Sequence, residues 1–374
     1  MSLKKNTIII LLLLLNSCIT EFIPKTKETK EFLVVEGLVT NQNGPNTIKL
    51  SRSFPLGTKN TSNPVTGCYV TISDDLNNVF DLTETDAGKY ITDSSKFWGK
   101  IGRFYTLHIR TNPSNSGYNY ESLPAQMIPV PPIDSVFYSK VTIQEGPDGT
   151  PSQEGCQVYL NAHDPNSLCK FYRWEYSETW EFHIPFPVPN RICWLSTNSD
   201  VINVKSTVAL SADKISMYPI NYISNTTDRL SVEYSILVNQ YSLNEDEYQY
   251  WEKLQNMTEQ VGGLYDRIPS AVPSNIYSLD DPNEKVQGYF SVSASSSKRI
   301  FIKDHFAGLV NQYSADKCVA DTLWGSAPPQ IPNPIYWILY SSQMPPYSLI
   351  TYSKGCYDCT VRGSNIPPDF WNNK

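Results

Sequence analysis

The fold is decided by the stretch Tyr234-Ser-Ile-Leu-Val-Asn-Gln-Tyr-Ser-Leu-Asn-Glu-Asp-Glu-Tyr-Gln-Tyr-Trp251, which continues to Gly263, because the spacing of its apolar residues changes along it. From Leu230 to Gln240 apolar residues alternate with other residues, which is the period of a half-buried strand. From Tyr250 the apolar residues recur every three or four positions, which is typical of one face of a helix. We therefore predict a strand that leads into an amphipathic helix at about residues 243–261.

Both ends of this helix carry recognisable signals. Ser242 with Glu245 three residues later fits a capping box, and Gly262-Gly263 supplies the left-handed residue that ends many helices. The surrounding sequence has the pattern of strands, so the helix is expected to pack on a sheet. We interpret it as a packing element without chemistry of its own. Its polar side is the surface that a partner protein could contact, and it comprises Glu245, Glu252, Lys253 and Glu259.

The N-terminus has the pattern of an export signal. Lys4 and Lys5 precede an apolar run from Ile8 to Leu15, which is much shorter than the roughly 20 residues that a bilayer-spanning helix needs. Leu15-Asn-Ser-Cys18 follows and resembles a bacterial lipobox, in which the peptide is cut before the cysteine. We expect residues 1–17 to be a lipoprotein signal peptide and Cys18 to carry the lipid, with palmitate among its acyl chains. An ordinary secretory signal with a chance cysteine is the alternative. Residues 18–30 are polar and charged and read as a flexible tether.

The charge balance argues against nucleic acid as a partner. The chain has 30 basic and 37 acidic residues, and removal of the signal peptide takes away two of the basic ones. Nucleic-acid affinity depends on clustered Lys and Arg that contact phosphates, and no such basic stripe is present. We also find no motif that predicts a cofactor.

Short strands separated by turn residues predict a mainly β protein with two domains. The first, residues 31–128, is expected to be a β-sandwich, and its segment Pro64 to Asp75 is similar to transthyretin-like domains, so the sandwich is expected to be transthyretin- or Ig-like. Three prolines in Pro129-Val-Pro-Pro132 indicate a linker. Residues 133–374 then form a second β-sandwich-like domain that carries the helix. In it Val286–Val292 and Arg299–Ile302 are expected to form a hairpin, and the C-terminal part is expected to be rich in loops and cysteines.

Cysteines in an exported protein pair readily, but the seven that follow Cys18 leave at least one unpaired. Cys356-Tyr-Asp-Cys359 has no second pair at a suitable spacing for zinc and no βαβ context for redox chemistry, which favours disulfides and predicts no metal site. The pairing cannot be read from the sequence. The candidates for disulfides are Cys193, Cys318, Cys356 and Cys359.

One strand is unusually rich in aromatic residues. Between Phe171 and Phe182, Trp174 and Trp180 fall on the same face of the strand. Packing in the core is the favoured explanation, and an aromatic platform for a ligand, with Trp174 and Trp180 in contact with it, is the alternative.

No catalytic motif is found. His-Glu-x-x-His, Gly-x-Ser-x-Gly and a phosphate-binding Gly-rich loop are all missing from the sequence. We therefore expect a binding or assembly protein and not an enzyme. Two alternatives stay open: a surface hydrolase that acts on glycan or peptide through an unidentified acidic pair, and a purely structural envelope lipoprotein.

The chain resembles the domain-of-unknown-function family 4249 over almost the whole mature length. The stretches that carry the resemblance include Val34-Val-Glu-Gly-Leu38, Tyr105-Thr-Leu-His-Ile109, Tyr172-Arg-Trp-Glu-Tyr176, Tyr234 to Leu243, Gly288-Tyr-Phe290 and Cys359-Thr-Val-Arg-Gly-Ser364. The resemblance implies an outer-membrane lipoprotein of bacteria that rely on TonB-dependent uptake. Together with the lipobox and the missing catalytic motifs, it leads us to expect an accessory partner of a TonB-dependent receptor β-barrel in nutrient uptake, which could also capture a small-molecule or oligomeric nutrient. It brings no catalytic residues. Only Glu21 is acidic between Ile19 and Pro24, which leaves the cell-surface and periplasmic faces both open.

Overall fold

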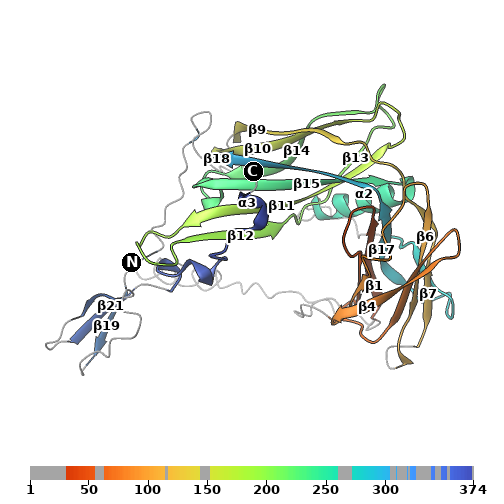
Figure 1. Cartoon of the computed structure of the whole chain (residues 1–374), viewed down its shortest axis with the longest axis horizontal. Coiled ribbons are helices and arrows are strands. Elements are labelled where there is room, and N and C mark those ends of the chain that lie inside the picture. Colours follow the sequence, from red (N-terminus) through yellow and green to blue (C-terminus); the bar gives the residue numbers. More distant parts are fainter. Residues whose placement is uncertain are drawn as a thin grey trace, which may run out of the picture.

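The computed structural model describes residues 31–54, 63–113, 117–143, 152–259, 272–303, 309, 318, 321–325, 338–341, 347–351 and 354–372 (Figure 1). The expected signal peptide, the tether with Cys18, and Gly262-Gly263 lie outside these residues. Within them the protein is mainly β, as the sequence predicts. No helix in the described ranges is long and apolar enough to cross a membrane.

An N-terminal β-sandwich is built from one ten-stranded sheet that folds over on itself. Its first eight strands are β1 (Leu33–Thr40), β2 (Thr47–Arg52), β3 (Tyr69–Asp74), β4 (Val79–Asp86), β5 (Lys89–Thr92), β6 (Phe104–Arg110), β7 (Asn119–Ser122) and β8 (Ala125–Gln126). Strand β4 belongs to both layers, because its first residues pair with β3 and its later ones with β5. Between the layers lies an apolar core that includes Val35, Ile72, Leu107 and Phe290.

Two strands of this sandwich come from far along the chain. Strand β17 (Val286–Ser293) pairs in parallel with β1, and β16 (Ile276–Ser278) pairs with β7. The sequence assigned all of 133–374 to the second domain, and for residues 276–293 the strand pairing corrects that assignment. The expected hairpin is also wrong, because the chain passes at the buried Ala294 out of β17 and into a different sheet. Alternating apolar residues indicate a strand but do not say which sheet it joins.

A second sandwich consists of two antiparallel sheets. One contains β9 (Ile133–Ile143), β10 (Gln153–His163) and β14 (Lys214–Ser224) in the order β14-β10-β9. The other has the order β12-β11-β15-β18, with β13 also paired to β11, and is formed by β11 (Phe171–His183), β12 (Ile192–Asn198), β13 (Asn203–Ser206), β15 (Glu233–Leu243) and β18 (Ser295–Lys303). The core between them includes Val158, Trp174, Tyr234 and Ile236. Figure 1 shows this sandwich extending away from the N-terminal one, with a helix at their junction.

That helix is α2 (Glu245–Glu259), and with β15 it confirms the change of period. The predicted capping box is wrong by two residues. Asn244 caps the helix, since its Oδ1 accepts from the backbone N–H of Glu247 at 2.8 Å. Ser242 is still part of β15, and its hydroxyl donates to the carbonyl of Ile128. Leu230, the expected start of the strand, lies in the short 3-10 helix η2 (Asp228–Leu230).

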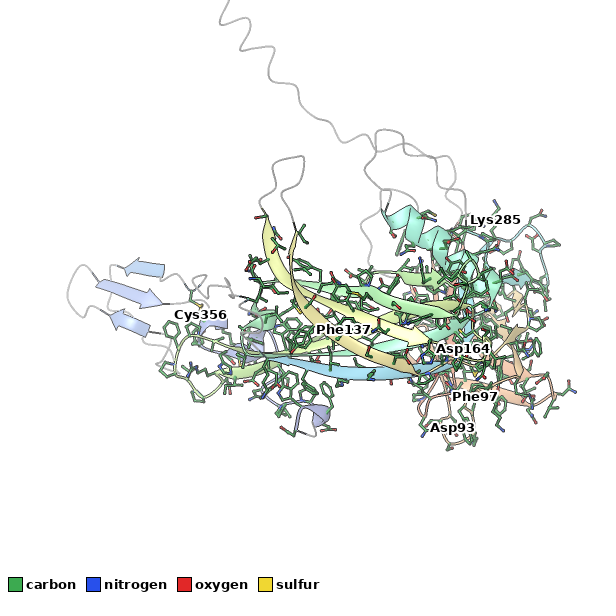
Figure 2. All side chains as sticks on the ribbon, turned by 90° about the horizontal axis from the view of Figure 1, so that it is seen from above. Asp93, Phe97, Phe137, Asp164, Lys285 and Cys356 are labelled. Carbon is green, nitrogen blue, oxygen red and sulfur yellow. A yellow bond between two sulfur atoms is a disulfide. The ribbon has the colours of Figure 1, made fainter. Side chains whose placement is uncertain are left out.

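The C-terminal part is held to the second sandwich by a disulfide and by aromatic contacts. Its elements are β19 (Asp321–Gly325), β20 (Ile338–Ser341), β21 (Tyr347–Thr351), η5 (Lys354–Cys356), η6 (Cys359–Val361) and α3 (Asp369–Asn372). Trp371 of α3 contacts the ring of Trp194 edge-on, with the ring centres 6.4 Å apart. Figure 2 shows Cys356 at one end of the molecule and Asp93 and Phe97 towards the other.

The parallel pairing of β1 with β17 is tested by Gly288→Ala. Gly288 has a φ of +86°, and a Cβ at this position would overlap the carbonyl of Val35. Gly102 has the same φ of +86° with nothing within 4 Å, so Gly102→Ala is a matched control. The left-handed conformation alone costs about 1–2 kcal/mol, and we expect Gly288→Ala to cost about 1–3 kcal/mol more because of the clash. Chemical denaturation of both variants measures the difference, and equal losses would contradict this pairing.

Candidate functional site

A cavity of about 310 Å³ lies at the junction of the two sandwiches, beneath α2. Strands β1, β2 and β17 of the N-terminal sandwich form one wall, and β11 with α2 forms the other. The residues around it are Val35, Glu36, Gly37, Leu38, Thr47, Lys49, Arg173, Glu175, Tyr250, Trp251, Gly288, Tyr289 and Ser291. Ligand sites commonly form at such junctions between domains.

Arg173 is the most distinctive residue of this wall. It lies on the face of β11 opposite to Trp174, which turns it away from the core of the second sandwich. Its guanidinium carbon is 4.3 Å from the ring centre of Trp251 and 5.1 Å from that of Tyr241. Nη1 donates to Glu175 Oε1 at 2.7 Å, while Nε has no hydrogen-bond partner among the described residues. The Arg173 side chain is 6% exposed and that of Glu175 is 42% exposed.

Glu247 lies behind this wall and is fully buried. Trp251 Nε1 donates to its Oε1 at 3.4 Å, and the two residues are one helical turn apart. Burial raises the pKa of the Glu247 carboxyl above its ordinary value of 4.5, although the Ser291 hydroxyl, the charge of Arg173 and the Trp251 indole each lower it. A buried carboxyl therefore supports the indole that stacks on Arg173.

The mouth of the cavity has one charge of each sign. Lys49 Nζ lies 3.7 Å from Glu36 Oε2, and both side chains are well exposed, so this pair contributes little to stability. Tyr250 and Tyr289 close another side, with ring centres 4.7 Å apart. Burial raises the pKa of the Tyr250 hydroxyl to about 12, so the hydroxyl is neutral at physiological pH.

Two smaller hollows share these walls. One of about 220 Å³ lies across Tyr250 and Tyr289, and one of about 130 Å³ lies across Arg173 and Trp251. Residues of α2 line all three hollows. The helix that the sequence presents as a packing element therefore also forms the roof of a recess.

The two tryptophans proposed as candidate ligand contacts belong to the core. Trp174 is fully buried and its Nε1 donates to Gln240 Oε1 at 2.9 Å. Trp180 is 4% exposed, with the guanidinium carbon of Arg229 4.8 Å from its ring centre. Neither ring is available as an exposed platform, so the packing explanation describes both.

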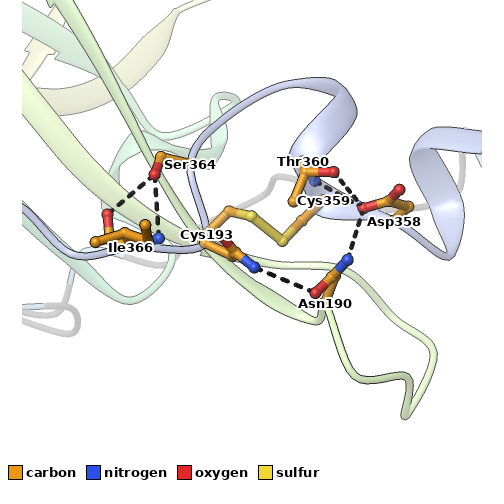
Figure 3. Close-up of a disulfide and its surroundings, with 8 residues drawn as sticks. Asn190, Cys193, Asp358, Cys359, Thr360, Ser364 and Ile366 are labelled. Atoms are coloured by element: carbon orange, nitrogen blue, oxygen red, sulfur yellow. Dashed lines mark hydrogen bonds between the residues drawn. A yellow bond between two sulfur atoms is a disulfide. The ribbon is translucent and has the colours of Figure 1, made fainter.

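The four candidate cysteines form two disulfides, Cys193–Cys359 and Cys318–Cys356. The first joins β12 to η6 beside Asp358, whose carboxylate accepts from Thr360 N–H at 3.1 Å and from Asn190 Nδ2 at 3.3 Å (Figure 3). Cys68, Cys156 and Cys169 are free, and Cys156 and Cys169 are buried. The Cys356-Tyr-Asp-Cys359 segment thus links two distant parts of the chain to one turn. No group of three or more His, Cys, Asp or Glu that could hold a metal occurs in the described ranges.

Sequence patterns alone do not single out Arg173 or Glu247 as site residues. Arg173 stands between Tyr172 and Trp174 in a strand that also carries Glu175, Glu178 and Glu181, so an arginine on its outer face gave no distinct signal. Glu247 gave no signal, because acidic residues are ordinary in the first turn of a helix. Three stretches that carry the family resemblance meet at the cavity: 34–38, 172–176 and 288–290.

Glu247→Gln is expected to change how stability depends on pH. The folded-state pKa is raised, so the stabilisation by the protonated carboxyl is complete below pH 4.5 and is lost as the pH rises through the raised value. The variant has no carboxyl to titrate at this position, so it does not lose this stabilisation. The difference between its free energy of unfolding and that of the wild type should therefore shift in favour of the variant from about pH 4 to about pH 8. Urea unfolding at both values measures the increase.

Glu245→Gln is the control for this experiment, since Glu245 is exposed in the same helical turn. A Glu247→Gln effect that is the same at acidic and neutral pH would contradict the assignment of a raised pKa to this carboxyl.

Comparison with known proteins places the chain in a family. A search of curated proteins finds no match to it. The model of the family described as domain of unknown function (DUF4249) matches residues 19–299, which are about three quarters of the chain and include every residue around the cavity. The chain therefore belongs to the DUF4249 family.

Proposed function

We propose that this protein is a lipid-anchored, non-catalytic binding protein of the outer membrane, which captures a small ligand and works as an accessory partner of a TonB-dependent uptake receptor. The observation that carries the proposal is the cavity of about 310 Å³ between the two sandwiches, which combines a buried cation with aromatic walls. Pockets that bind small molecules are mostly apolar and contain a few fixed polar groups. This cavity has that composition.

The anchor is supported by the N-terminal sequence. Cys18 follows the short apolar run directly, and acylation of this cysteine with more than one chain would hold the protein stably at the membrane. Residues 19–30 then separate the lipid from Glu31, where the described structure begins. A chain of this length spans at most about 40 Å when fully extended. That reach keeps the binding cavity close to the membrane in which a receptor barrel would lie.

The receptor is supported by the resemblance to the family and by the exposed polar side of α2. Glu245 and Lys253 are exposed on the helix that roofs the cavity. A partner that contacts this side would therefore lie next to the ligand, which is the arrangement that transfer into a barrel requires.

Purification of the tagged protein in mild detergent should bring down a β-barrel receptor, identified by mass spectrometry. A double charge change on the roof, Glu245→Lys with Lys253→Glu, should reduce the amount of receptor because it alters the charges at the contact. The exposed pair Lys89 and Asp86, on β5 and β4, supplies the matched control when their charges are exchanged. Recovery of the lipoprotein alone from native membranes would count strongly against the proposal.

Cys18→Ala should release the protein from the membrane. Without the thiol no lipid can be attached, so the variant should fail to incorporate a radiolabelled fatty acid and should fractionate with soluble protein. Cys68→Ala, at a free and half-buried cysteine, is the control that should leave both properties unchanged. A Cys18→Ala protein that still carries label and stays in the membrane would show that the anchor lies elsewhere.

A further inference from the structure

We propose that the junction cavity binds its ligand through a carboxylate, with Arg173 as the anchor, and that the ligand is a small carboxylic acid with an apolar body. This inference rests on the proposed binding function and specifies the chemistry of that site. The free acid could be an amino acid, the C-terminus of a short peptide, or another organic acid, because all three present the same group to a guanidinium.

Burying Arg173 at this position costs the fold free energy. A guanidinium stays protonated in proteins, so burial does not neutralise it and its charge needs a partner. The helix covers this face of β11 with Trp251, and the neighbouring Leu243 on β15 is also buried there, so an apolar residue would pack well at position 173. Glu175 is the one ion-pair partner described for Arg173, and its side chain is nearly half exposed. The charge of Arg173 also acts on the buried Glu247 carboxyl, but burial raises the pKa of that carboxyl and favours its neutral form, so the cation at the cavity wall is only partly neutralised.

The guanidinium of Arg173 is held in place by two aromatic rings. The rings of Trp251 and Tyr241 both lie against it, which restricts the plane of the group. A fixed planar fork of N–H donors matches the two oxygens of a carboxylate. One hydrogen bond to Glu175 uses a single donor of the five, and Nε is unpaired among the described residues. A ligand carboxylate would replace the half-exposed Glu175 on this group.

Apolar and aromatic side chains border the cavity beside Arg173. Next to Arg173 the cavity is bordered by Leu38, Tyr250 and Trp251, which suit an apolar body. Its volume of about 310 Å³ is at the lower end of known ligand pockets, and two separate hollows of about 220 and 130 Å³ share lining residues with it. A single amino acid or a short peptide fits this space, while most of a long polymer would have to lie outside the cavity, beyond its mouth.

The experiment measures binding to the purified full-length protein in detergent by calorimetry. The probes are L-phenylalanine, a phenylalanine dipeptide and 3-phenylpropionate, each paired with its carboxamide, together with a neutral monosaccharide. We expect at least one acid to bind and its carboxamide to bind at least about tenfold more weakly, because the charge-assisted pair is lost. The pattern among the three acids identifies the source of the carboxylate.

Four variants separate an anchoring role from a structural one. Arg173→Gln should abolish binding of the acid, and Arg173→Lys should weaken it because the bidentate fork is lost. Glu175→Gln should tighten binding, since the competing carboxylate is removed; a merely structural ion pair would not give this result. Arg110→Gln is the matched control, because Arg110 also lies over a tyrosine ring, 5.0 Å from the centre of Tyr69, but on the N-terminal sandwich outside the cavity. Unfolding in the absence of ligand checks that each variant is folded.

Three outcomes would overturn the inference: equal binding of acids and carboxamides, binding that persists in Arg173→Gln, or binding of the monosaccharide alone. Absence of binding by every acid would overturn it as well. The proposed function fails separately, through loss of the receptor from the detergent purification. Carboxylate binding without a receptor would leave this inference standing, and a receptor without carboxylate binding would remove the inference and leave the receptor partnership.

Discussion

The side-chain amide of Gln240 is fully buried and ties the linker between the two sandwiches to the second sandwich. Its Nε2 donates to the carbonyl of Pro131 at 2.8 Å, and its Oε1 accepts from the indole of Trp174 at 2.9 Å. Ser242, two residues later, is also fixed in place, because its backbone N–H donates to the carbonyl of Ala294 at 3.1 Å. The first crossing contains Pro131 and the second contains Ala294. Strand β15 therefore binds both crossings at once, and a buried amide that lost either partner would carry an unsatisfied group.

This attachment also places the recess. Because β15 is held at Gln240 and Ser242, the chain leaves the sheet at a defined point, and Asn244 caps α2 only two residues later. The helix must then lie across the junction, with Trp251 over Arg173 of the second sandwich and Tyr250 against Tyr289 of the first. The two walls of the cavity belong to different sandwiches, and α2 contacts both. Because the crossings are fixed, the two walls of the cavity are also fixed relative to each other, which is preorganisation of the candidate site.

The local parts of this arrangement could be predicted from the sequence, and the long-range parts could not. Periodicity alone predicts β15 and α2, because each depends on neighbours within a few residues. The cap was misplaced because Ser242 and Asn244 are both good capping residues, and only the tertiary bond from Ser242 to Ile128 decides between them. The parallel pairing of β1 with β17 joins residues about 250 positions apart, and alternation is the same in either sheet. Trp174 and Trp180 are candidates for ligand contact because they are aromatic. Their even spacing along β11 places both on the same face of the strand, and that face packs in the core.

Arg173 illustrates why a site is harder to predict than a fold. Alternation along β11 assigns it correctly to the face opposite to Trp174, but on an exposed sheet face an arginine is unremarkable. It becomes informative only when α2 covers that face, and α2 covers it because β15 is fixed at both crossings. The strand pairing of β17 then adds Tyr289 and Ser291 from the other sandwich. Arg173 is in this way packed under α2 and beside Tyr241 of β15, at a cavity whose other wall comes from β1, β2 and β17. Under the proposed binding role, its charge is the main constraint on the ligand.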